Sequence, residues 1–118
     1  MTSPFADGGG HELEPEQVAE KLREGGWQVV DVREGYEREA GFIGETRHIE
    51  LERLASQAES LDRDRPVIFY CRMGSRSGMA TQAFRASGWD AYNMRGGITA
   101  WAGRGLPLEP DGGTVADH

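Results

Sequence analysis

The chain has 118 residues, which is the length of one domain, and its formal net charge is −7. That charge argues against nucleic acid or an anionic membrane surface as a partner, because both are bound through basic patches. The single cysteine excludes an intramolecular disulfide and is typical of a reducing compartment. The sequence shows neither a secretory signal nor an apolar stretch long enough to span a bilayer, so we expect a cytoplasmic protein.

Helices and strands are expected to alternate along the chain. In chain order they are a helix over 14–24, a strand over 27–33, a helix over 51–61, a strand over 66–70, a helix over 77–86 and a strand over 91–94. This order implies crossover connections, and therefore an α/β fold with helices on both faces of a central parallel sheet. Residues 1–10 and 110–118 are polar and glycine-rich, so we expect flexible tails around a folded domain of residues 11–109.

The loop after the most apolar of these strands carries the residues best suited to catalysis. Cys71 follows the strand at its carboxyl end, where open α/β sheets bind their ligands. Between Cys71 and the next helix lie Arg72, Met73, Gly74, Ser75 and Arg76. A helix N-terminus, a glycine that lets backbone amides turn inward, and two arginines all favour a thiolate and a bound anion. A buried structural cysteine is the alternative, but it would have no use for the glycine and the arginines.

Four segments of the sequence resemble motifs of the rhodanese family. Residues 71–77 resemble its active-site loop, C-R-x-G-x-R-S, and residues 31–34 resemble its D-V-R-E segment. Residues 93–101 resemble its G-G-I-x-x-W closing motif, and residues 105–107 its G-L-P ending. The resemblance extends over residues 11–109 and implies a three-layer α/β sandwich around a central parallel sheet.

The resemblance also implies a sulfurtransferase that carries sulfur as a persulfide on Cys71. The thiolate would attack the outer sulfur of a donor such as thiosulfate, and cyanide or a thiol would then accept that sulfur. The backbone amides of residues 72–76 would hold the persulfide, while Arg72 and Arg76 would hold the anionic end of the donor. Besides the small-molecule donor and acceptor, a sulfur-accepting protein is a candidate partner. We expect no cofactor and no metal site, because the sequence has no cluster of cysteines and histidines at ligand spacing.

Other residues have expected roles around this loop. Asp31 and Arg33 follow a strand on the same edge of the sheet as Cys71, and we expect them to form an ion pair or to anchor loops. Trp101 is expected to pack in the core, and His48 to be exposed rather than to shuttle protons. Where the rhodanese family usually has G-H-I-P-G-A, residues 41–46 lack the histidine and the proline, so we expect a looser or repacked wall there.

Three other functions share parts of this pattern. A cysteine phosphatase needs the loop C-x5-R, but here Ser77 holds the place of that arginine and Arg76 comes one residue early. A binding module without activity generally loses the cysteine or the charges of the loop, and this chain keeps both. A sulfur carrier that feeds a partner protein uses the same chemistry, and the sequence leaves this alternative open.

Overall fold

The computed structural model describes residues 11–116 and is built around one parallel sheet. Its five strands lie in the order β1-β5-β4-β2-β3, and every neighbouring pair is parallel. The strands are β1 (Glu12–Leu13), β2 (Gln28–Asp31), β3 (Arg47–His48), β4 (Val67–Tyr70) and β5 (Ala91–Met94). The central strand β4 is buried along its whole length, which is why its sequence is a continuous apolar run.

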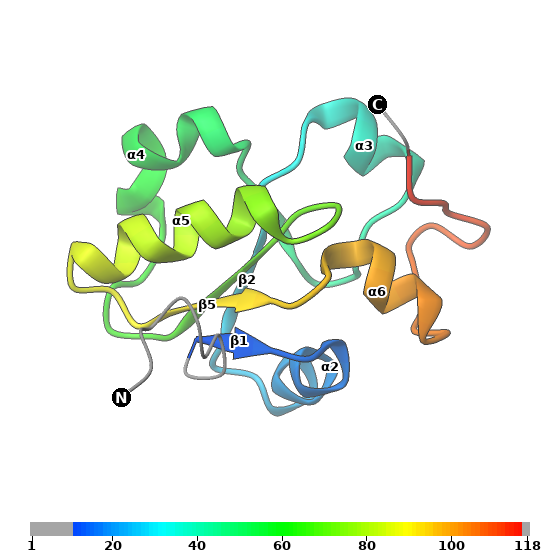
Figure 1. Cartoon of the computed structure of the whole chain (residues 1–118), viewed down its shortest axis with the longest axis horizontal. Coiled ribbons are helices and arrows are strands. Elements are labelled where there is room, and N and C mark those ends of the chain that lie inside the picture. Colours follow the sequence, from blue (N-terminus) through cyan, green and yellow to red (C-terminus); the bar gives the residue numbers. More distant parts are fainter. Residues whose placement is uncertain (1–10, 117–118) are drawn as a thin grey trace.

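Helices cover both faces of this sheet (Figure 1). One face carries α5 (Ser75–Ala86) and α4 (Leu54–Gln57), which is flanked by the 3-10 turns η1 (Leu51–Arg53) and η2 (Ala58–Ser60). The other face carries α2 (Pro15–Glu24) and α6 (Gly97–Gly103), whereas the short helix α3 (Gly35–Ala40) follows β2. No helix in this part of the chain is long and apolar enough to cross a membrane.

The two faces of the sheet build two separate hydrophobic cores. Neighbouring residues on a strand point to opposite faces, so β4 contributes Phe69 to one core and Ile68 to the other. Phe69 meets Phe84 of α5 edge to face, with ring centroids 4.9 Å apart. On the opposite face, Ile68 shares a core with Trp101 of α6, and the Trp101 indole N–H donates to the carbonyl oxygen of Pro107 at 2.8 Å. The expected α/β sandwich and the packing role of Trp101 are confirmed.

Several elements differ from those expected. The helix expected over 51–61 is a 3-10 turn, one turn of α-helix and a second 3-10 turn, and α5 begins two residues earlier than expected. The strand β1 and the helices α3 and α6 were not expected. The six residues of α3 include two glutamates and an arginine and show no apolar stripe, and α6 begins at a pair of glycines that the sequence analysis reads as a turn.

The C-terminal segment also differs from the expected flexible tail. The Thr114 backbone N–H donates to the carbonyl oxygen of Ala40 at 2.8 Å, and Val115 packs against the core beneath α2 and α6. These contacts pack residues 110–116 against the domain. A polar, glycine-rich sequence does not reveal a backbone hydrogen bond to a residue so distant in the chain. The tail expected over 1–10 lies outside the described residues, as do the last two residues of the chain.

Candidate active site

Cys71 directly follows β4 and is buried, with 1% of its surface exposed. Its Sγ accepts hydrogen bonds from the Gly74 N–H at 3.1 Å, the Ser77 N–H at 3.4 Å and the Ser77 hydroxyl at 3.3 Å. The three donors converge at the N-terminal end of α5, where unpaired amides and the helix dipole favour negative charge. Sγ therefore lies where an anionic sulfur is stabilised.

The start of α6 holds the backbone of the Cys71 loop in this shape. The Ile98 N–H donates to the carbonyl oxygen of Cys71 at 2.9 Å, and the Thr99 N–H donates to that of Arg72 at 3.0 Å. Gly97 has a φ of +63°, and a Cβ atom there would lie 2.5 Å from the Cys71 oxygen and closer still to the Arg72 oxygen. These contacts fix the backbone of Cys71 and Arg72, the two residues with which the loop begins.

Gly74 turns the loop into α5. Its φ of +106° favours glycine, and its carbonyl oxygen accepts the Gly78 N–H at 3.0 Å. The same oxygen accepts a hydrogen bond from Nδ2 of Asn93 at 3.2 Å, and that nitrogen also lies 3.0 Å from a carboxylate oxygen of Glu12. Asn93 of β5 and Glu12 of β1 thus support the turn at Gly74.

The other end of the loop is fixed by an ion pair. Both terminal nitrogens of Arg76 donate to the Glu37 carboxylate, at 2.8 and 2.9 Å. Glu37 is fully buried, and its Oε1 also accepts the backbone N–H of Glu34, the residue that caps α3. This two-bond arginine–carboxylate geometry is the most directional form of ion pair. It determines where the guanidinium group of Arg76 lies relative to Cys71.

The pair changes the acidity of both partners. Burial by itself would raise the pKa of Glu37, but the hydrogen bonds from Arg76 and from the Glu34 backbone, together with the charges of Arg76 and Arg33, lower it below its ordinary value. The hydrogen bonds to Glu37 raise the pKa of Arg76. Both groups are therefore charged at neutral pH.

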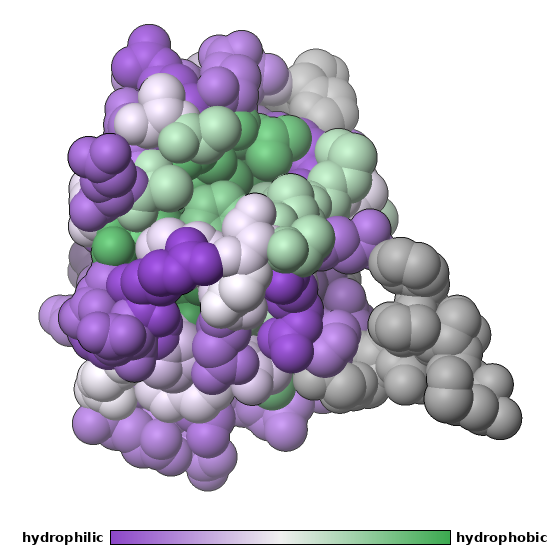
Figure 2. All heavy atoms as spheres, turned by 90° about the vertical axis from the view of Figure 1, so that its left-hand side faces the viewer, coloured by the Kyte–Doolittle hydropathy of each residue, from purple (hydrophilic) through white to green (hydrophobic). Residues whose placement is uncertain are grey.

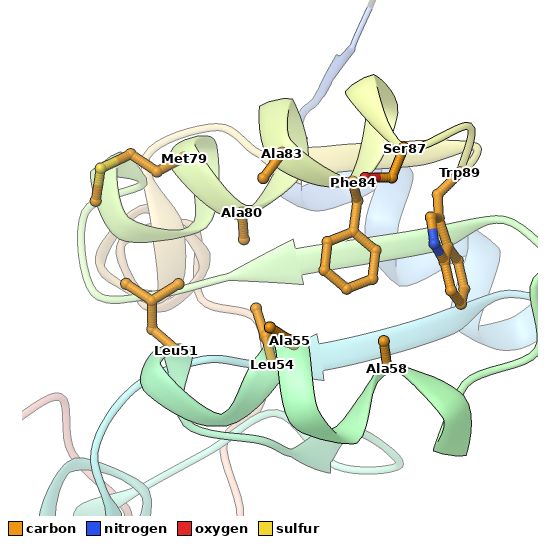
Figure 3. Close-up of a pocket in the computed structure, with 10 residues that line it drawn as sticks. All are labelled: Leu51, Leu54, Ala55, Ala58, Met79, Ala80, Ala83, Phe84, Ser87 and Trp89. Carbon is orange, nitrogen blue, oxygen red and sulfur yellow. The ribbon is translucent and has the colours of Figure 1, made fainter.

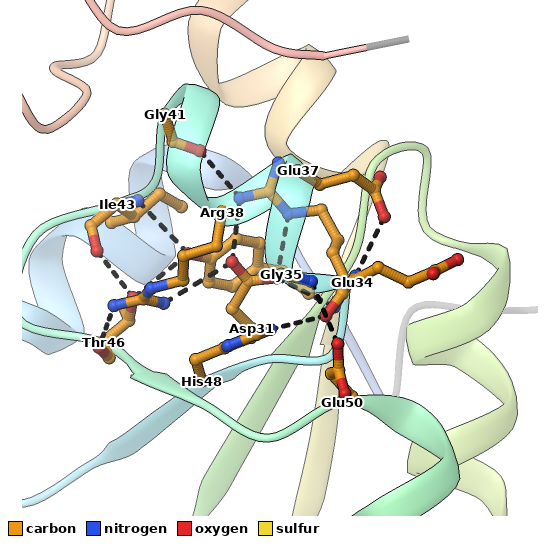
Figure 4. A network of polar contacts seen from close by, with 12 residues as sticks. Asp31, Glu34, Gly35, Glu37, Arg38, Gly41, Ile43, Thr46, His48 and Glu50 are labelled. Atoms are coloured by element: carbon orange, nitrogen blue, oxygen red, sulfur yellow. Dashed lines mark hydrogen bonds and ion pairs between the residues drawn. The ribbon is translucent and has the colours of Figure 1, made fainter. Parts of the chain in front are cut away.

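The expected pair of Asp31 and Arg33 forms at the carboxyl end of β2, and both residues are fully buried. Figure 4 shows Asp31 within the network of polar contacts around α3. Nε and Nη2 of Arg33 donate to the two Asp31 oxygens at 2.9 and 2.8 Å. Nη2 also donates to the carbonyl oxygen of Gly41 at 2.8 Å, and the Asp31 carboxylate faces Arg38 at 3.5 Å. Contacts with Arg38 inside α3 and with Gly41 at its C-terminal end thus hold that helix, and with it Glu37, against the sheet.

His48 differs from its expected place at the surface. It is half-buried, and its Nε2 lies 2.6 Å from the carbonyl oxygen of Arg33. Its position at the end of β3, beside β2, explains the contact, because strand pairing places it next to Asp31. His48 therefore supports the backbone of the loop between β2 and α3.

The remaining residues predicted for the loop lie nearer to solvent. Met73 is 56% exposed, Ser75 is exposed and Arg72 is half-buried. Of the amides expected to surround the sulfur, that of Gly74 donates to Sγ. Ser77, which lies just outside the predicted set, contributes the two other donors.

Comparison with known proteins identifies the family. The model of the rhodanese-like domain matches residues 14–104. The chain belongs to the rhodanese-like domain family. It is 37% identical over 90 residues to the thiosulfate sulfurtransferase GlpE of Pseudomonas aeruginosa. That alignment covers 75% of this chain and 81% of the relative. A sulfurtransferase of Allochromatium vinosum is 31% identical over 105 residues, covering 86% and 98%. The crystal structure of a rhodanese-related protein from Thermoplasma volcanium superposes with a TM-score of 0.77 at 26% identity, covering 83% of this chain and 96% of that one.

The wall that departs from the usual rhodanese sequence is repacked rather than loose. The Thr46 hydroxyl donates to the carbonyl oxygen of Ile43 at 2.6 Å and lies 3.1 Å from the Tyr70 hydroxyl. The Tyr70 hydroxyl accepts a hydrogen bond from the Ile43 N–H at 3.2 Å, and Ile43 itself is buried. Phe42 stands where the family usually has histidine. The Arg38 guanidinium group covers its ring, at 4.0 Å from the ring centroid.

Four residues of the site in this rhodanese-like domain were not predicted from the sequence: Glu37, Ser77, Asn93 and Gly97. For Glu37, the signal was its spacing of three from Glu34, which predicts a capping box and hence a helix start. For Gly97, the signal was a pair of glycines one residue after the end of a strand, at the edge of the sheet where Cys71 lies. Ser77 was visible in the loop motif, but its side chain had been given no role.

Proposed function

We propose that this protein is a sulfurtransferase in which Cys71 accepts sulfane sulfur and carries it as a persulfide. The observation that carries the proposal is the convergence of three hydrogen-bond donors on the buried Sγ, at 3.1 to 3.4 Å. Membership of the rhodanese-like family and similarity to the thiosulfate sulfurtransferase GlpE of Pseudomonas aeruginosa support it.

The reaction consists of two displacements at sulfur. The Cys71 thiolate attacks the outer sulfur of thiosulfate; a new S–S bond forms while the old one breaks, and sulfite leaves with the bonding electron pair. Cyanide or a thiolate then attacks the outer sulfur of the persulfide, giving thiocyanate or a new persulfide, and Cys71 leaves as a thiolate. Negative charge thus returns to Sγ in each cycle, where Gly74 and Ser77 are placed to stabilise it.

The two arginines of the loop have different roles in this proposal. Arg76 is held by Glu37, so it acts by fixing the loop and by contributing positive charge at a distance. To Arg72, which follows Cys71 directly and is half-buried, we assign the anionic end of the donor. The amides of residues 72–76 would surround the outer sulfur of the persulfide.

Phosphate hydrolysis is the weaker alternative. The residue six positions after Cys71 is Ser77, and its hydroxyl donates to Sγ instead of reaching outward to a phosphoryl group as an arginine would. A phosphoryl group presents three outer oxygens, and each one left without a donor costs roughly 1–3 kcal/mol. We therefore expect no efficient turnover of an aryl phosphate.

The decisive experiment compares wild type with Cys71→Ser. Incubation with thiosulfate should add the mass of one sulfur atom to the wild-type protein, and cyanide should remove it with release of thiocyanate. Cys71→Ser should do neither. A wild-type mass that is unchanged by thiosulfate, or Cys71-dependent phosphatase turnover, would contradict the proposal.

A further inference from the structure

An apolar groove runs between α4, with its two flanking 3-10 turns, and α5, and has a volume of about 540 Å³. Figure 3 shows the side chains of the two walls pointing toward each other across it. Leu51 and Met79 lie at one end, Ala55 and Ala83 line the middle, and Trp89 lies at the other end. The groove is thus a long trough above the hydrophobic core, bounded by side chains of two elements.

Part of the lining of this groove is exposed in spite of its apolar character, whereas Leu54, Ala80, Phe84 and Trp89 belong to the buried core. Met79 is 59% exposed, and Ala55 and Ala83 are exposed as well. Figure 2 shows apolar side chains gathered in a hollow with hydrophilic side chains around it. Contiguous apolar surface of this kind on a soluble domain marks a site that contacts a partner.

The groove begins close to the candidate active site. The helix α5 starts at Ser75, inside the Cys71 loop, and Met79 lies about one helical turn further on. From Met79 the lining continues to Ser87, a span of roughly 12 Å at 1.5 Å per helical residue. Such a length holds two or three apolar side chains of a bound segment, which is more than a small sulfur donor can present.

The end of the groove nearest the loop is acidic. A second hollow of about 280 Å³ lies there, lined by Glu34, Glu50 and Glu52 as well as by Arg76. Leu51 lines both the groove and this hollow, so the two adjoin at that residue. With Glu37, which pairs with Arg76, four carboxylates here face two arginines, the second being Arg53, whose Nε lies 3.6 Å from Glu50. The excess of carboxylates sets the sign of the local field.

We propose that the groove and the adjoining hollow together dock a protein segment that presents apolar side chains to the groove and lysine or arginine to the acidic hollow. The proposal rests on the proposed sulfur transfer, and it names the sulfur acceptor as a protein of this chemistry. A thiolate on the docked partner would attack the outer sulfur of the Cys71 persulfide, forming one S–S bond as another breaks, and the Cys71 thiolate would leave. The chain's net charge of −7 adds long-range attraction for a basic partner.

The test uses three synthetic peptides of equal length, each with one cysteine at its end. The first combines leucine and lysine on the two faces of a helix, the second replaces lysine by glutamate, and the third replaces leucine by serine. Sulfur transfer from the persulfide should have a kcat/KM at least about tenfold higher for the first peptide than for either of the others. Versions with serine in place of cysteine should show the same order in fluorescence anisotropy, which measures docking independently of sulfur transfer.

Matched variants locate the binding. Ala55→Lys and Met79→Lys place a cation in the groove, and both should abolish the preference for the leucine–lysine peptide. Gln82→Lys adds the same charge to an exposed position of α5 outside the groove and should retain it. Thiocyanate formation from cyanide should be the same in all three variants, because none of them alters the Cys71 loop.

Three results would overturn the docking proposal: equal binding of all three peptides by wild type, an unchanged preference in Met79→Lys, or a wild-type dimer that Met79→Lys dissociates in sedimentation. The dimer would show that a second copy of the chain occupies the groove. Loss of thiocyanate formation together with normal peptide binding would instead overturn the proposed sulfur transfer and leave the docking surface supported.

Discussion

Arg76 and Glu37 are 39 residues apart in the chain, and two parallel hydrogen bonds of 2.8 and 2.9 Å join them. Through this contact the last residue of the Cys71 loop is fixed to α3. The helix α3 is in turn held by the buried pair of Asp31 and Arg33 at the end of β2. The geometry around Sγ therefore depends on carboxylates that never touch the sulfur.

Replacement of Glu37 by glutamine should destabilise the protein and slow sulfur transfer. Removing one partner of a buried ion pair costs about 3–5 kcal/mol, and the partial exposure of Arg76 places this case at the lower end. Thermal unfolding should therefore show a Tm lower by about 10 °C or more. Glu39→Gln removes an exposed carboxylate of the same helix and should leave Tm and activity unchanged. Equal behaviour of the two variants would show that the ion pair contributes nothing.

The same pair should make stability depend on pH in acid. The pKa of Glu37 is lower in the folded protein than its ordinary value of 4.5, so an unfolded chain takes up the proton first as the pH falls. The stabilisation is complete above that ordinary value and is lost as the pH falls through the lowered pKa. Denaturant unfolding between pH 7 and 3 should show a smaller decrease in stability for Glu37→Gln than for wild type. A decrease of the same size in both would contradict this assignment.

Tyr70 should make stability decrease as the pH rises in alkali, the opposite of the effect of Glu37 in acid. Burial, with the nearby charge of Asp31, raises the pKa of Tyr70 from 10.0 to about 12. The neutral phenol is thus stabilised by the fold, and this contribution of about 2–3 kcal/mol is complete below pH 10 and lost as the pH rises toward 12. Tyr70→Phe should be less stable at pH 7, because Thr46 and Ile43 lose a hydrogen-bond partner, but its stability should decrease less between pH 10 and 12. Tyr36→Phe, at an exposed position, is the control at pH 7, where it should leave stability unchanged.

The parts of the fold that sequence analysis predicted are those in which adjacent residues carry the signal. The apolar run of β4 and the contiguous loop from Cys71 to Arg76 both show their role in a single short segment. Glu37 was missed because its role arises from a partner 39 residues away, and its own segment gives no sign of burial. Gly97 was interpreted as a turn, since its close approach to the loop depends on two strands ending side by side. His48 was misplaced because pairing of β3 with β2 brings it to the Arg33 carbonyl.

Gly97→Ala should damage the site more than the fold. A Cβ atom at Gly97 would overlap the carbonyl oxygens of Cys71 and Arg72, so the loop would have to move. A displacement of about 1 Å at a reacting group can cost on the order of a hundredfold in rate. We expect at least a tenfold loss in kcat/KM for sulfur transfer, with near-native circular dichroism. Gly103→Ala, in the same helix with nothing within 4 Å of the added atom, should keep full activity. Equal activity of the two variants would show that the start of α6 does not hold the loop.

Ser77→Ala separates the side-chain donor from the two amide donors. The variant keeps the hydrogen bonds from the backbone of Gly74 and Ser77 to Sγ and removes the one at 3.3 Å from the hydroxyl. A hydrogen bond to a charged group contributes about 1.5–3 kcal/mol, which corresponds to a decrease of roughly tenfold to a hundredfold in the rate of steps that need an anionic Sγ. Both persulfide formation and sulfur release should slow, because Sγ is the nucleophile in the first and the leaving group in the second.

Rapid mixing with thiosulfate, and then with cyanide, measures the two steps separately. Ser75→Ala, at an exposed position of the same loop, should leave both unchanged. A Ser77→Ala variant that forms and releases the persulfide at wild-type rates would show that the amides alone stabilise the sulfur.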